Sequence, residues 1–239
     1  MRHDELLPYI SNHLPVFFGP AAGSLVWDVT AWKKPSSALQ DLTLIQQLQG
    51  APKLNVTGSL AVKRLSFIYL GALLAYYRSG EHWDLAASSV QIAHDKESVF
   101  QLKLYTAEVS LSRTSPQNWM EPVKDNFINW LKPLVEAVER VTKVNQIILW
   151  ENVFIYLKWF YEVLAPSLSE LEENEWKNQW EEIVSESFFG EDTPNPFAYL
   201  NKTKAKRTME DGKRVRHTCC YKYRLPGGKN CKTCCQIKA

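Results

Sequence analysis

All five cysteines of this 239-residue chain lie among its last 21 residues, and residues 1–218 contain none. Most of the chain must therefore fold without covalent cross-links. Its composition allows this, because 45% of the residues are hydrophobic and 12% are aromatic, enough to bury a substantial core. We expect a self-sufficient body over residues 1–200, followed by a basic segment over 201–239 in which the cysteines build one local site.

The spacing of apolar residues predicts a mainly helical body. A helix capped by Thr57 or Ser59 and stopped by Gly80 has apolar residues on nearly every face, so we expect it at the centre of the fold. A second helical pattern spans 119–141, and Pro133 lies inside it and should kink or split the helix. Further helices are predicted over 145–164, ending before Pro166, and over 171–188.

Strand patterns are confined to short stretches. Residues 90–94 and 99–104 alternate between apolar and polar side chains and flank the polar run Asp95–Ser98, which predicts a hairpin at about 88–105. Residues 25–29 form a weaker candidate strand. The expected fold class is therefore α+β: predominantly helical, with a small antiparallel sheet and a C-terminal cysteine-rich metal-binding segment.

The cysteine spacing reads C-C-x10-C-x2-C with one cysteine left over. Four thiolates brought together are ligands for zinc or for an iron–sulfur cluster. Leu225-Pro-Gly-Gly228 predicts a type II turn, which would fold the chain back so that the two pairs meet. The predicted ligands are Cys219, Cys220, Cys231 and Cys234, with Cys235 as a spare that could replace Cys234.

The adjacent pair Cys219–Cys220 bears on the choice of metal. Neighbouring side chains of an extended segment point to opposite faces, so both can be ligands only if the backbone bends there. A tetrahedral zinc usually takes its thiolates from knuckles spaced two to four residues apart, whereas a two-iron cluster is wider and needs two thiolates per iron. The pair therefore favours a [2Fe–2S] cluster over zinc, with a thiol or disulfide role as a further alternative. His217 is expected outside the ligand set.

Charge is divided unevenly along the chain. The net charge is +2, but residues from Lys202 onward hold 12 Lys or Arg and only two acidic residues. The cysteines thus lie in a positive field on an acidic body, although a basic run can also be merely solvated. The start of the chain has no signal-peptide pattern, and the longest apolar run, Phe67–Tyr77, is about half a membrane span. We expect a cytoplasmic protein without a membrane span, where thiols stay reduced.

Three stretches of the C-terminal segment carry a family resemblance: His217-Thr-Cys-Cys220, Tyr221-Lys-Tyr-Arg-Leu-Pro-Gly-Gly228 and Cys231-Lys-Thr-Cys234. Together they resemble the terminal signature of the FhuF-like ferric-siderophore reductases, cytoplasmic proteins whose [2Fe–2S] ligands follow this spacing. Leu149-Trp-Glu-Asn152 is similar to a helix of that family. The related reductases often have Pro after the last ligand, where this chain has Cys235.

The resemblance implies an iron–sulfur-dependent oxidoreductase that passes one electron to siderophore-bound Fe³⁺ and releases Fe²⁺, with no catalytic residues beyond the cluster ligands. Basic residues near the cysteines would attract an anionic ferric siderophore of citrate or hydroxamate type. No GxGxxG or P-loop pattern is present, so electrons should come from an external ferredoxin or flavoprotein. The candidate substrate-binding residues are Lys213, Arg214, Arg216, Lys222 and Arg224.

Two other functions compete with this hypothesis. A zinc-stapled basic segment could bind nucleic acid or protein, with Tyr221 and Tyr223 stacking on bases, but the adjacent cysteines and the acidic body fit it poorly. A non-catalytic iron–sulfur sensor would share the cluster without turnover, and no helix-turn-helix pattern supports DNA reading. We therefore expect no nucleic-acid partner.

Overall fold

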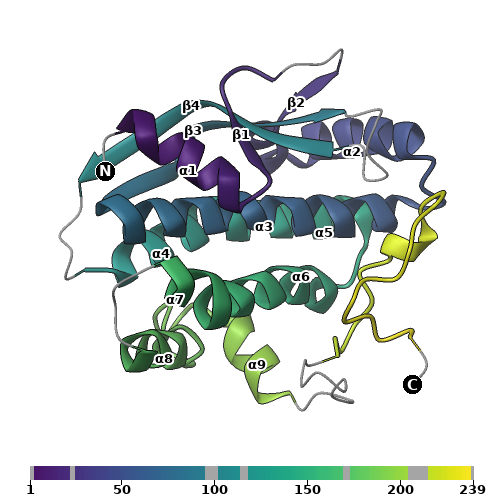
Figure 1. Ribbon diagram of the computed structural model, residues 1–239. Helices are drawn as coiled ribbons and strands as arrows, with labels where there is room; N and C mark the ends of the chain where they lie inside the picture. Colours follow the sequence, from purple (N-terminus) through teal and green to yellow (C-terminus); the bar gives the residue numbers. More distant parts are fainter. Residues whose placement is uncertain are drawn as a thin grey trace.

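The computed structural model describes residues 3–21, 25–94, 102–113, 118–168, 173–203 and 215–237. The fold is α+β and predominantly helical, as predicted, with one four-stranded sheet. In Figure 1 the sheet forms an upper layer, one long helix crosses the middle, and further helices lie beneath it. The strands are β1 (Val16–Phe18), β2 (Val26–Asp28), β3 (Glu81–His94) and β4 (Leu102–Arg113). The helices are α1 (His3–His13), α2 (Pro35–Gln49), α3 (Leu54–Ser79), α4 (Met120–Asn126), α5 (Lys132–Thr142), α6 (Gln146–Trp159), α7 (Ala165–Leu168), α8 (Glu173–Ile183) and α9 (Pro196–Lys202).

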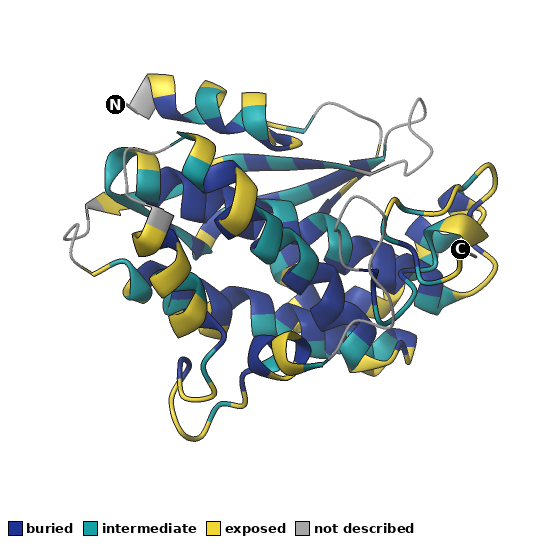
Figure 2. Ribbon diagram, turned by 60° about the horizontal axis from the view of Figure 1, so that its bottom comes forward, coloured by how far each residue is buried: buried dark blue, intermediate teal, exposed yellow. Residues whose placement is uncertain are grey.

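Helix α3 is the central element that the sequence predicted. It packs against β3 on one side and α6 on the other, and its buried residues run around the helix because both faces are covered. It is long and apolar enough to cross a membrane, but 83% of its most apolar window is buried inside the protein, the usual setting of a core helix. Figure 2 shows the same concentration of buried residues through the middle of the molecule.

The ends of α3 agree with prediction only in part. Gly80 adopts a left-handed conformation at φ +71°, and its N–H donates to Tyr76, so the predicted stop is confirmed. The predicted start is wrong, because the helix begins at Leu54 without a side-chain cap. Thr57 and Ser59 lie buried within the helix instead. The hydroxyl of Ser59 is thereby free for a contact with the cysteine segment.

The predicted hairpin is formed by β3 and β4, which pair antiparallel with Ile92 opposite Leu104. The predicted turn, Asp95–Ser98, lies outside the described residues. β3 begins at Glu81, much earlier than expected, because the ladder is irregular between Asp84 and Val90 and this breaks the alternation. β2 confirms the weaker strand candidate at 25–29, while β1 pairs parallel to β4 and makes the sheet mixed rather than antiparallel.

Prolines shape the helices on the other side of α3. Pro133 stands in the first turn of α5, directly after a π-helical turn at Phe127–Leu131, so the predicted irregularity is confirmed. Asn145 caps α6 by accepting a hydrogen bond from the Ile147 amide. The predicted end before Pro166 is wrong, because a second π-helical turn, Phe160–Leu164, leads on into α7.

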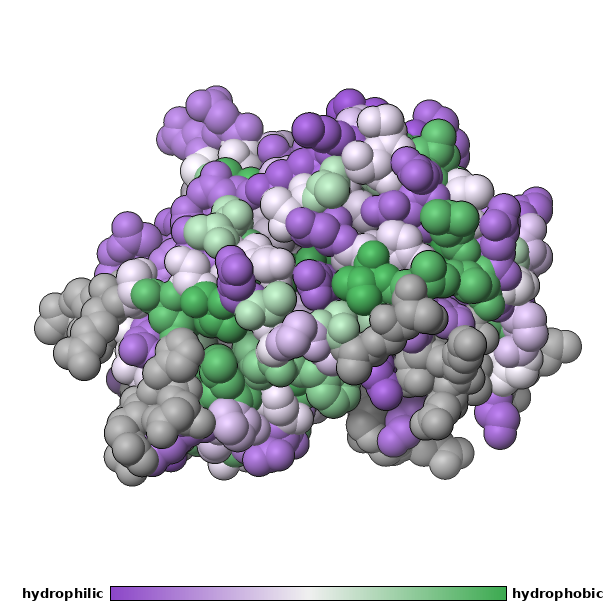
Figure 3. All heavy atoms as spheres, turned by 90° about the horizontal axis from the view of Figure 1, so that it is seen from above, coloured by the Kyte–Doolittle hydropathy of each residue, from purple (hydrophilic) through white to green (hydrophobic). Residues whose placement is uncertain are grey.

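Hydrophobic side chains on the sheet side do not merge into one apolar face. Seen from above, hydrophobic patches lie among hydrophilic side chains (Figure 3). The larger exposed apolar residues are scattered over several elements, including Phe17 on β1, Val26 on β2 and Leu39 on α2. Scattered exposure of this kind is ordinary for a folded protein.

The cysteine segment, residues 215–237, has a single short 3₁₀ turn at Lys222–Arg224 as its regular structure. It lies beside the N-terminal end of α3 and beside α6, at the right of the molecule in Figure 1. A small apolar cluster attaches it to the corner between α2 and α3, where Leu225 packs with Ala51, Val56 and Leu60. The segment is therefore held by side chains rather than by pairing with the sheet.

Candidate metal centre

The cysteines of the segment lie close to one another. Cys220 and Cys234 are buried, at 1% and 3% exposure, and the other three are half-buried. The Cys231 thiol donates a hydrogen bond to the Cys220 sulfur, which brings the two pairs of the spacing together as expected. All five are free thiols, and no three His, Cys, Asp or Glu side chains of the described ranges already form a closed metal-binding group. The arrangement is thus a gathering of thiols that is compatible with a metal site.

A backbone bend follows the adjacent pair directly. Tyr221 adopts the left-handed conformation at φ +62°, one of two described non-glycine residues to do so. This conformation costs about 1–2 kcal/mol for an ordinary residue, so the surrounding contacts must hold it in place. The Tyr221 amide donates to the Cys219 sulfur at 3.3 Å, and the Lys222 amide donates to Cys220. Backbone amides are therefore directed at both sulfurs of the adjacent pair.

The turn between the two pairs matches its prediction. Gly227 has φ +67° and the Gly228 amide donates to the Leu225 carbonyl at 2.8 Å, as in a type II turn. After the turn, the Cys234 amide donates to the Cys231 carbonyl at 3.0 Å, which closes the C-x2-C knuckle. Both features reverse the chain and return the second pair of cysteines to the first.

Helix α6 holds the start of the segment through a buried carboxylate. Glu151 is 1% exposed, and its two oxygens accept hydrogen bonds from the amides of His217 at 2.6 Å and Thr218 at 2.7 Å. The Thr218 hydroxyl also donates to it. Two ordered amides next to Cys219 thus depend on one side chain of a core helix.

Asn152 completes this attachment and extends it to α3. Its carboxamide oxygen accepts from the Arg216 guanidinium at 2.6 Å, and its nitrogen donates to the backbone carbonyl and the hydroxyl of Ser59. The Ser59 hydroxyl in turn donates to the Cys220 carbonyl at 3.1 Å. Sequence reasoning noted Glu151 and Asn152 only through the family resemblance. The signal that could have identified them is chemical: two adjacent polar side chains in the middle of a largely apolar helix need partners.

Positive charge surrounds the thiols. The Lys63 ammonium on α3 lies 3.8 Å from the Cys220 sulfur. The pKa of Cys220 is lowered chiefly by the hydrogen bond from Cys231, while Lys63 and Arg216 contribute further attraction. The pKa of Cys231 is raised because it keeps the proton of that hydrogen bond, and burial raises the pKa of Cys219 to about 11. One thiol of the group is therefore disposed to ionise first.

The residues around the thiols fit an anionic metal–thiolate group. Arg216 Nε and His217 Nδ1 are buried without a hydrogen-bond partner among the described residues, and the Arg216 charge acts on Cys220, Cys231 and Cys235. Residues 215–237 contain five Lys or Arg and no Asp or Glu. A thiolate-ligated cluster carries negative charge and is stabilised by donors and cations of this kind.

The five predicted substrate-binding residues do not share one environment in the structure. Lys213 and Arg214 lie outside the described residues. Arg216 is 3% exposed and its guanidinium binds Asn152, so its first role is internal. Lys222 is half-buried and faces a cavity, whereas exposed Arg224 lies over the ring of Tyr221, 4.7 Å from its centroid.

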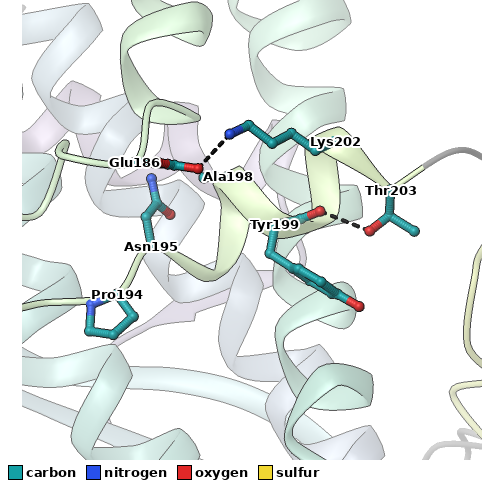
Figure 4. A pocket seen from close by; sticks show the side chains of 7 residues that line it. All are labelled: Glu186, Pro194, Asn195, Ala198, Tyr199, Lys202 and Thr203. Atoms are coloured by element: carbon teal, nitrogen blue, oxygen red, sulfur yellow. Dashed lines mark hydrogen bonds and ion pairs between the residues drawn. The ribbon is translucent and has the colours of Figure 1, made fainter.

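Several hollows lie in the part of the molecule that carries the segment and the lower helices. A cavity of about 1000 Å³ lies between α3, α6 and the cysteine segment and includes Cys231 in its wall. A smaller one of about 540 Å³ lies along α9 and is lined by Glu186, Asn195 and Tyr199 (Figure 4). In the smaller hollow Glu186 is paired with Lys202, and no cysteine takes part in its lining. The larger cavity is therefore the one related to the thiols.

No protein-family model matches this chain. Among characterised proteins, the chain is similar to the ferric siderophore reductase of Escherichia coli (strain K12), with 30% identity over 122 residues. The matched stretch is 50% of this chain and 41% of that protein, so this chain spans less than half the length of its relative. The similarity agrees with the expected theme of siderophore-related reduction.

Proposed function

We propose that this protein is a ferric-siderophore reductase in which Cys219, Cys220, Cys231 and Cys234 hold a [2Fe–2S] cluster. The observation that carries the proposal is the gathering of these thiols by a bend at Tyr221 and a turn at Gly227, inside an acid-free basic segment. When bound, such a cluster accepts and donates single electrons. The similarity to a protein named ferric siderophore reductase supports the same chemistry.

The proposed reaction is the transfer of one electron from a donor protein to the ferric siderophore. An external ferredoxin or flavoprotein loses one electron, and siderophore-bound Fe³⁺ gains it and becomes Fe²⁺. Siderophores bind iron through hard oxygen donors, which suit the ferrous ion far less well, so the iron is released. We place this reaction in the cytoplasm, with an anionic siderophore of citrate or hydroxamate type as substrate.

The chain's own residues have three tasks in this scheme. Glu151 and Asn152 fix the backbone that precedes the first two ligands. Lys63 and Arg216 stabilise negative charge on the sulfurs, which favours the reduced state and raises the reduction potential. Arg216 Nε has no hydrogen bond among the described residues and only a long ion pair with Glu151, at 3.9 Å, so it is available to a sulfur acceptor.

The test begins with protein purified without oxygen. We expect equal amounts of iron and acid-labile sulfide, visible absorption that bleaches with dithionite, and an EPR signal from the reduced protein. Ferric siderophore should then be consumed with a ferrous chelator as trap. Cys231→Ser should lose the iron and Cys235→Ser should keep it. Zinc in place of iron, or iron without turnover of any ferric siderophore, would contradict the proposal and favour a binding module or a sensor.

A further inference from the structure

The cavity of about 1000 Å³ beside the thiols is built from two helices and the cysteine segment. Leu60, Lys63, Arg64 and Phe67 line it from α3, and their spacing of three and four residues places them on one face of that helix. Tyr156, Lys158 and Trp159 are among the residues that contribute from α6, and Cys231, Lys222 and Lys232 contribute from the cysteine segment. A molecule in this cavity would therefore lie directly against one of the proposed ligands.

One wall of the cavity is strongly cationic. Lys63, Arg64, Lys222 and Lys232 line it, and Glu162 is the one acidic residue among the described lining residues. Glu162 already pairs with Lys158. Like charges held together at the wall of a cavity favour an anionic occupant.

Aromatic side chains also line the cavity. The ring centroids of Phe67 and Tyr156 lie 4.5 Å apart, and Trp159 also lines the cavity. Lys63 joins the two regions, because its ammonium lies 5.8 Å from the centroid of the Tyr156 ring as well as near Cys220. The cavity thus combines a charged wall with a flat apolar surface, the usual composition of a small-molecule site.

We infer that this cavity is the chelate-binding site, and that it selects ferric complexes with net negative charge and free carboxylate groups over neutral hydroxamate complexes. The inference rests on the proposed function and narrows its substrate class. The carboxylates would lie on the Lys222–Lys232 side, and the body of the complex would pack on Phe67, Tyr156 and Trp159. A neutral complex would fill the same space without compensating the cationic wall.

Binding can be measured apart from reduction by using gallium(III), which has the charge of Fe³⁺ and is not reduced. Calorimetry on the iron-loaded full-length protein should show gallium citrate binding at least tenfold more tightly than a neutral gallium trihydroxamate at low salt. The double variant Lys222→Gln/Lys232→Gln should weaken gallium citrate binding at least tenfold and reduce its salt dependence. Trp159→Ala should weaken it with the salt dependence unchanged.

The matched control is Lys53→Gln/Lys229→Gln, which removes the same charge from two exposed residues outside the cavity lining. This control variant should change the affinity for gallium citrate less than twofold. Equal losses in the two double variants, or equal affinity for the citrate and hydroxamate complexes, would overturn the inference. Tight, variant-sensitive gallium citrate binding confirms the site whether or not ferric citrate is reduced, and absence of reduction would contradict the proposed function instead.

Discussion

At the scale of single residues, the site depends on a carboxylate that belongs to the core rather than to the cysteine segment. Glu151 accepts two backbone amides of that segment and lies 3.9 Å from the Arg216 Nε atom. A buried carboxylate is tolerated only when donors and an opposite charge compensate it. The same contacts order the backbone immediately before Cys219, so stability and ligand placement are coupled at this residue.

Replacing Glu151 with Gln should therefore lower the free energy of unfolding by about 3 kcal/mol, because the buried Arg216 charge loses its counterion. Urea unfolding of the metal-free protein measures the change. The control is Glu162→Gln in the segment after α6, whose side chain is 48% exposed and pairs with Lys158, and it should cost less than about 1 kcal/mol. Similar losses in both variants would show that Glu151 is not a structural anchor.

The sequence predicted the cysteine arrangement far better than the residues that support it. The turn at Gly227 depends on neighbours in the chain, so local chemistry was enough to expect it, whereas the left-handed conformation of Tyr221 was not predicted. The contacts of Glu151 and Ser59 join residues 66 and 161 positions apart, which no local pattern reports. The polarity of Glu151 and Asn152 within an apolar helix indicated only that a partner had to exist.

At the scale of elements, the cysteine segment is held at two points with almost no regular structure of its own. Arg216 and the amides that follow attach to α6, and Leu225 packs at the α2–α3 corner, where Pro226 also lies near Gly50.

The sequence did not predict strand β1 or helix α2, because the local pattern of each is weak. β1 has only three residues and pairs with a strand far along the chain. In α2 the apolar residues are not confined to the buried face, since Leu39 and Leu44 are exposed.

Truncating Leu225 to Ala should release the second attachment without unfolding the body. Loss of a buried leucine costs about 2–3 kcal/mol, and here that loss falls on docking of the segment. A change of about 2 kcal/mol raises the population of the open segment roughly thirtyfold. The buried thiols of Cys220 and Cys234 in the metal-free protein should react with a thiol reagent faster by that factor, since their reaction rate follows the open population.

Far-UV circular dichroism of Leu225→Ala should match that of the parent protein. Ile237→Ala, at an exposed residue of the same segment, should leave the thiol reaction rate unchanged. If both variants accelerate the reaction equally, packing of Leu225 does not hold the segment.

At the scale of the whole molecule, the body contributes far more buried hydrophobic surface to stability than the cysteine segment does. The main hydrophobic core runs from Leu6 to Leu200 and includes no cysteine. The segment contributes Leu225 to a separate, small cluster. We therefore propose that the body folds as a unit through α9 and that residues 215–237 dock on it, while the expected division at residue 200, which falls inside α9, stays a prediction.

This division predicts the effect of removing the metal. A variant with Ser in place of Cys219, Cys220, Cys231 and Cys234 should keep its far-UV circular dichroism and a cooperative thermal transition, with the midpoint lowered because bound metal stabilises the native state by mass action. Small metal-dependent domains behave differently, since they unfold when the metal is lost. The measurement is a thermal melt of the variant beside iron-loaded parent protein and Cys235→Ser, which should melt like the parent. Loss of helical signal in the fourfold variant at low temperature would mean that the metal centre organises the body. The large cysteine-free core argues against that outcome, because burial on this scale is sufficient to fold a domain of this length without a metal.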